Sequence, residues 1–114
     1  MELGKILLPQ FSSDKVTVWQ VNGFYVRNSI FLDYSQGGNA QKYEWIPAGE
    51  IWLDDANKLE HAFIALHELT ESNLMAKGME YDQAHDLANF IEKVARDIPE
   101  SVMDLIKAEL ERIK

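Results

Sequence analysis

The residues best suited to chemistry lie in the segment Ala-Leu-His-Glu-Leu-Thr-Glu, residues 65–71. His67 and Glu71 are four residues apart, so on an α-helix they share one face and can hold one metal ion together. Glu68 lies between them and is suited to activate a water molecule bound at that ion. The segment therefore predicts a metal-dependent hydrolytic site on a helix.

Two more side chains of ligand type follow on a second expected helix, His85 and Glu92. If the two helices fold back antiparallel around Gly78, His85 lies level with Glu71, and Glu92 lies level with the turn that carries His67. The four groups then converge on one side of the helix pair. This convergence has two interpretations, a metal site or an interhelical hydrogen-bond network without metal.

The elements before this helix pair are expected to form a sheet. Residues 16–21 alternate apolar and polar side chains, and residues 24–34 are rich in β-branched and aromatic side chains. Asn22-Gly23 between these runs predicts a two-residue hairpin turn. A flexible loop is expected at residues 35–40, and short strands at 43–46 and 50–53. This half predicts an antiparallel sheet of three or four strands.

The second half predicts three helices. Asp55 is expected to be the N-cap of the first, whose apolar stripe begins at Leu59, and Gly78 is expected to end it. A second helix begins near Asp82, and Pro99 separates it from a third. The prediction is an α+β fold, a single domain of residues 1–114 with the sheet in 1–54 and the helices in 55–114.

Composition narrows the class of partner. The net charge is −8, and residues 51–114 carry 14 Asp and Glu against 7 Lys and Arg, so we expect no nucleic-acid binding. No run of about 20 apolar residues is present, so we expect no membrane span. Without cysteine, any metal must be held by histidine and carboxylate. A cytoplasmic location is expected, and apolar stripes on three short helices make a homodimer a further expectation.

The stretch from Glu50 to Glu92 resembles zincin-like minimal metalloproteins, and in particular small uncharacterised phage or prophage proteins. The resemblance rests on four short segments: 50–55 (Glu-Ile-Trp-Leu-Asp-Asp), 66–69 (Leu-His-Glu-Leu), 78–81 (Gly-Met-x-Tyr) and 84–85 (Ala-His). The zincin motif is His-Glu-x-x-His, and this chain has Glu71 at the last position.

The resemblance implies a zinc ion held by His67, Glu71 and His85, with Glu68 as the catalytic general base. Glu92 would orient a histidine ligand by contacting the ring nitrogen that does not bind the metal. In zincins a strand before the metal helix receives the substrate backbone, which implies an exposed edge strand at Ile51, Trp52 and Leu53. The implied function is a zinc-dependent hydrolase acting on peptide or amide bonds.

The alternative is a phage-encoded interaction module without enzymatic activity. Its acidic helices or its sheet edge would bind a host or virion protein, and the His/Glu cluster would be structural. A carboxylate-bridged di-iron site is disfavoured, because such sites use Glu-x-x-His pairs and neither His67 nor His85 has a glutamate three residues before it.

Overall fold

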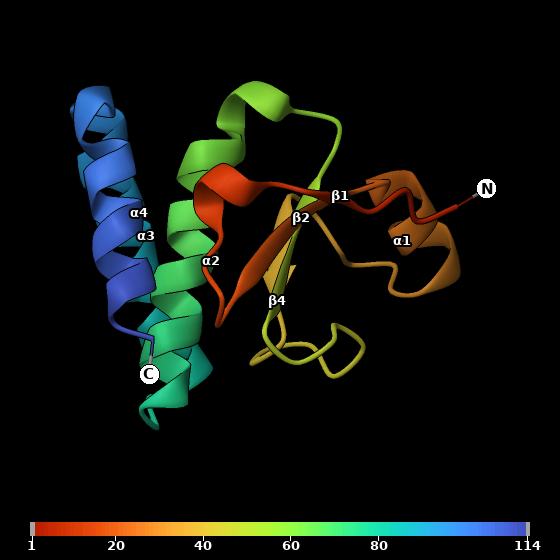
Figure 1. Ribbon diagram of the computed structural model, residues 1–114. Helices are drawn as coiled ribbons and strands as arrows, with labels where there is room; N and C mark the ends of the chain where they lie inside the picture. The colour runs from red at the N-terminus through yellow and green to blue at the C-terminus, as the bar shows by residue number, and fades with distance from the viewer. Residues whose placement is uncertain (1, 114) are drawn as a thin grey trace.

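The computed structural model describes residues 2–113 and has an α+β architecture, as expected (Figure 1). Its strands are β1 (Ile6–Leu7), β2 (Thr17–Val21), β3 (Gly37–Asn39) and β4 (Glu50–Asp54). Its α-helices are α1 (Gly23–Ser29), α2 (His61–Ala76), α3 (Tyr81–Asp97) and α4 (Val102–Glu111). Short 3₁₀ turns occur at η1 (Pro9–Phe11), η2 (Lys58–Glu60) and η3 (Pro99–Ser101).

The four strands form one mixed sheet in the order β1-β2-β4-β3. β1 pairs antiparallel with β2, and β3 pairs antiparallel with β4. The two central strands, β2 and β4, run parallel, with Val18 opposite Ile51. The expectation of an entirely antiparallel sheet was therefore wrong, although the strand count and the fold class were right.

The parallel pairing arises because Asn22-Gly23 begins a helix instead of turning a hairpin. The Asn22 side chain accepts a hydrogen bond from the backbone N–H of Tyr25 at 3.1 Å, the geometry of an N-cap. The chain enters α1 where a second strand was predicted. Residues 43–46 form turns, and the Tyr43 and Trp45 rings stack there with centroids 4.8 Å apart. β3 lies within the predicted loop.

The helix that carries the motif begins later than expected, at His61 instead of after Asp55. The Asp54 carboxylate accepts a hydrogen bond from the backbone N–H of Ala56, and the Asp54 carbonyl lies 2.8 Å from His61 Nε2. The chain thus wraps around Asp54 before the helix starts. Leu59, where the predicted apolar stripe begins, is 92% exposed, whereas His61 is buried.

α2 is the central helix of the molecule and lies between the sheet on one side and α3 and α4 on the other (Figure 1). Eight consecutive residues of α2, from Ile64 to Glu71, are buried. Ile51 and Leu53 of β4 face this helical layer, and Trp52 faces the opposite cluster with α1. The alternation of strand side chains thus gives the sheet two apolar faces.

The two helices after α2 lie where the sequence placed them. Gly78 has φ of 100°, a conformation that only glycine adopts without strain, and the N–H of Met79 bonds the Leu74 carbonyl at 3.1 Å. This turn returns α3 antiparallel along α2. Among residues 2–113, no helix is both long enough and apolar enough to cross a membrane.

Candidate metal centre

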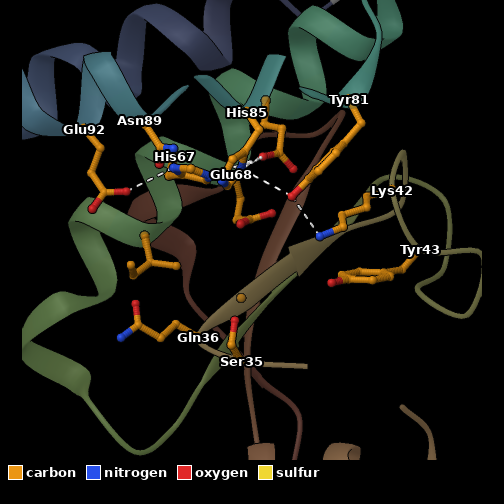
Figure 2. A pocket seen from close by; sticks show the side chains of 13 residues that line it. Ser35, Gln36, Lys42, Tyr43, His67, Glu68, Tyr81, His85, Asn89 and Glu92 are labelled. Atoms are coloured by element: carbon orange, nitrogen blue, oxygen red, sulfur yellow. Dashed lines mark hydrogen bonds and ion pairs between the residues drawn. The ribbon is translucent and has the colours of Figure 1, made fainter. Parts of the chain in front are cut away.

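A cavity of about 300 Å³ lies where α2, α3 and the start of β3 meet. Figure 2 shows side chains of α2 and α3, and of the segments before and after β3, around it. β3 can approach α2 closely because residue 37 is glycine. A Cβ there would lie 2.8 Å from Cγ2 of Ile64 and 3.4 Å from Cγ of Glu68. The short strand therefore forms one wall of the cavity directly beside the motif.

His67, Glu71 and His85 form a cluster in this cavity. Glu71 Oε2 lies 3.2 Å from His67 Nε2 and 2.8 Å from His85 Nδ1. One nitrogen from each histidine and one Glu71 oxygen all lie within 4.8 Å of one another. The expected convergence of these side chains is confirmed. α2 and α3 pack so that the side of α2 with His67 and Glu71 faces the side of α3 with His85.

The fourth predicted residue, Glu92, reaches the far side of the His67 ring. Its Oε1 lies 3.0 Å from His67 Nδ1, although the N–H is not aligned for a hydrogen bond. Arg96 donates to the other Glu92 oxygen at 2.8 Å and also to Glu60 at 2.9 Å. Arg96 thus holds Glu92 in a position where its other carboxylate oxygen faces His67.

Asn39, the last residue of β3, joins the two carboxylates of the motif. Its Nδ2 donates to Glu68 Oε1 at 2.9 Å and to Glu71 Oε1 at 3.1 Å. Its Oδ1 accepts from the backbone N–H groups of Gln41 and Lys42. Asn39 is fully buried, so these hydrogen bonds hold Glu68 beside Glu71 and fix the loop that follows the strand.

The charges of the cluster shift the pKa values of its members in opposite directions. Burial would lower the pKa of His67, but Glu71 and Glu92 outweigh it and raise that pKa to about 10. Burial, reinforced by the Glu71 charge, raises the pKa of Glu68 to about 7. For Glu71 burial acts upward, but the two histidines hold its pKa below the usual value. Neighbouring carboxylates thus differ in their readiness to take up a proton.

Lys42 and Tyr81 close the opposite side of the cavity. The Lys42 ammonium donates to Tyr81 Oη at 2.9 Å, and Tyr81 Oη lies 3.3 Å from His85 Nδ1 (Figure 2). The Tyr81 ring stacks on the His85 imidazole with centroids 5.3 Å apart. Of the described residues that line the cavity, Lys42 is the only lysine or arginine.

The predicted substrate strand is corrected by the sheet order. Ile51, Trp52 and Leu53 belong to β4, which has β2 on one side and β3 on the other, so its backbone is already paired. All three side chains are buried. The edge strand beside the cavity is β3, whose Gly37 lines it.

Two residues of the site were missed by sequence reasoning, Asn39 and Lys42. They follow the glycine pair of a segment that resembles a flexible loop, and they have no periodic pattern that marks them. Their position depends on the pairing of β3 with β4, which joins residues far apart in the chain. No signal in the sequence alone identifies them.

No protein-family model, curated protein or solved structure significantly matches this chain. The zincin-like and phage resemblance therefore stays a prediction.

Proposed function

We propose that this protein is a zinc-dependent hydrolase of peptide or amide bonds. The observation that carries the proposal is the cluster of His67, Glu71 and His85 donor atoms within 4.8 Å of one another at a cavity that also holds Glu68. Two histidines and a carboxylate are a common ligand set of catalytic zinc, which keeps a fourth position open for water or substrate.

The donor distances fit such an ion. Zinc–nitrogen distances of 2.0–2.1 Å in a tetrahedral site place neighbouring ligand atoms about 3.3 Å apart. The two contacts that Glu71 Oε2 makes with the histidines, at 3.2 and 2.8 Å, are close to this spacing. Small side-chain movements on α2 and α3 would complete the geometry without moving the helices.

A zinc ion, when bound, lowers the pKa of a coordinated water to about 7 and polarises a carbonyl. Glu68 would accept the proton of the attacking water and return it to the departing nitrogen. Burial raises the pKa of Glu68 to about 7 in the metal-free protein, and a bound zinc ion would lower it, so the carboxylate would be ionised and able to accept this proton near neutral pH. Asn39 would hold that carboxylate in place through its Nδ2.

Glu92 would act as an orienting residue. A carboxylate behind a histidine ligand fixes the ring and raises its basicity, and Glu92 Oε1 lies 3.0 Å from the His67 nitrogen that faces away from Glu71. Arg96 and Glu60 extend this support to the start of α2.

A peptide substrate would approach the edge strand β3 at Gly37, its half-buried residue that lines the cavity, because Gly38 and Asn39 are buried. Extended peptides can bind an exposed edge by adding a strand. β3 replaces the β4 segment that sequence reasoning chose for this role.

The test is the Glu68→Gln variant, assayed with a library of quenched fluorescent peptides on zinc-loaded protein. The wild type should cleave members of the library, and the variant should bind zinc equally well and lose turnover. Turnover that survives in Glu68→Gln would exclude the mechanism, and no cleavage by the zinc-loaded wild type would count against the peptidase assignment.

A second candidate, an interaction module, is favoured by an apolar stripe on α3. Leu87, Phe90 and Val94 of α3, with Ile98 at its C-cap, repeat at helical spacing and are between 37% and 62% exposed. A second copy of this chain could cover the stripe. Phe90→Asp should then abolish a dimer seen by sedimentation, and Phe24→Asp, at a similarly exposed phenylalanine on α1, should not. A monomeric wild type would exclude self-association through this stripe.

A further inference from the structure

Lys42 is the feature of the cavity that the hydrolytic scheme leaves without a role. Its side chain comes from the loop after β3 and lies beside Tyr81 of α3 on one side of the cavity (Figure 2). The remaining charged side chains on the lining are Glu68, Glu71, Glu92 and the two histidines of the cluster. A lysine in these surroundings is the one group suited to a negatively charged part of a substrate.

The position of the ammonium is fixed by its neighbours. Lys42 Nζ lies 4.3 Å from the centroid of the Tyr81 ring and 4.7 Å from that of Tyr43, so two aromatic faces hold it. The backbone N–H of Lys42 is bonded to the buried Asn39 side chain, which also fixes Glu68. The ammonium and the proposed general base are therefore positioned by the same residue.

The ammonium also keeps donors for a ligand. An ammonium has three N–H donors, and in the described residues only Tyr81 Oη accepts from Lys42 Nζ by hydrogen-bond geometry. Tyr81 Oη in turn lies 3.3 Å from His85 Nδ1, one of the proposed zinc ligands. The Tyr81 hydroxyl oxygen thus lies between the Lys42 ammonium and the His85 ring. A small molecule can therefore contact both Lys42 and the proposed zinc ligands.

We propose that Lys42 binds a carboxylate of the substrate, separated by two atoms from the carbonyl carbon that is hydrolysed, a spacing that the contacts of 2.9 and 3.3 Å through Tyr81 Oη allow. The inference rests on the proposed function. Two kinds of substrate have this spacing. In the first, the leaving amine is an amino acid with a free C-terminus. In the second, the acyl group carries a free carboxylate of the aspartyl type. Both carry the same carboxylate into a cavity of about 300 Å³, which suits a short substrate.

The charges of the cavity make this recognition depend on the metal. Without an ion, the carboxylates of Glu68, Glu71 and Glu92 offset the positive charge of Lys42 and the histidines, and a carboxylate gains little. Zinc brings two positive charges and displaces the proton of His67, so the cavity gains one positive charge in total, which acts together with Lys42. The metal-loaded protein should bind carboxylate-bearing ligands, and the metal-free protein should not.

The test compares two zinc-binding probes by calorimetry on the zinc-loaded protein. Acetohydroxamate binds through its hydroxamate alone, and succinic monohydroxamate adds a carboxylate two atoms from the carbonyl carbon. In the wild type the added carboxylate should improve the dissociation constant by about tenfold, the low end for a charge-assisted hydrogen bond. In Lys42→Gln that gain should disappear while the acetohydroxamate affinity stays unchanged.

Lys107→Gln, an exposed lysine on α4, is the matched control and should keep the full gain. An equal gain in Lys42→Gln and in the wild type would overturn the assignment of Lys42 and leave the zinc site intact. Failure of both probes to bind because the protein holds no zinc would overturn the proposed function together with this inference. N-acetylglycine and succinamate, used as competitors, identify which side of the scissile bond carries the carboxylate.

Discussion

Replacing Glu68 by glutamine should stabilise the metal-free protein at pH 8 even though it removes the proposed general base. Glu68 is buried beside Glu71, and its pKa is raised from 4.5 to about 7. Between these values the folded protein holds a proton that the unfolded chain has released, so stability falls as the pH rises through this window. Above pH 7 the full loss, about 3 kcal/mol, is present in the wild type.

Glutamine has no charge to bury, and its amide oxygen can still accept from Asn39 Nδ2. Its amide nitrogen can donate to Glu71, which shares that Asn39 group. We therefore expect Glu68→Gln to raise the free energy of unfolding at pH 8 by about 1–3 kcal/mol. The gain should nearly vanish near pH 4.5, where Glu68 is protonated in the folded wild type and half-protonated in the unfolded chain.

Urea unfolding of both proteins in EDTA, followed by circular dichroism from pH 4.5 to 8.5, measures this difference directly. Other titrating groups are shared by the two proteins and largely cancel. A difference that does not change with pH, or a variant less stable than the wild type at pH 8, would refute the burial argument for Glu68.

Three more predictions concern the proposed zinc site. Glu92→Gln should weaken zinc binding by about 10- to 100-fold in a chelator competition, because the support behind His67 is lost; an unchanged affinity would remove Glu92 from the site. Zinc should raise the melting temperature more at pH 8 than at pH 6, because His67, with a pKa raised to about 10, must release a proton to bind the ion and does so more readily at higher pH; the opposite trend would exclude His67 as a ligand. Asn39→Leu should lower the free energy of unfolding by about 1–3 kcal/mol in urea, because two carboxylates and two backbone N–H groups lose their partner; a neutral change would show that Asn39 does not hold the motif.

The helical half of the site could be predicted because its signals are local. The period of 3.6 residues places His67 and Glu71 on one helix face, and Gly78 returns the next helix antiparallel. These two facts bring His85 level with Glu71. The hand of packing, which decides whether the two edges face each other, depends on side-chain shape and was not available from the sequence.

The sheet half could not be predicted because its pairing is not local. Asn22-Gly23 suits a hairpin turn and a helix N-cap equally well, and the bond from Tyr25 N–H decides for the helix. That choice turns an antiparallel neighbour into the parallel pair of β2 and β4. Asn39 and Lys42 reach the cavity only through this topology.

The burial of Glu68 has the same origin. On α2 alone it lies about 100° from His67 around the helix axis and would face away from a single apolar layer. β3 approaches that side of α2 through Gly37 and covers the carboxylate. A helix covered on several sides does not follow the one-sided pattern on which sequence analysis depends.

The most direct test of the account is the zinc content of the protein, purified without chelator or histidine tag and measured by elemental analysis. The account predicts about one zinc per chain in the wild type and in His61→Gln, whose histidine lies on α2 outside the cluster, and almost none in His67→Ala. Absence of zinc from the wild type, even after incubation with the ion, would contradict the account and leave the cluster of His67, Glu71 and His85 as a structural network.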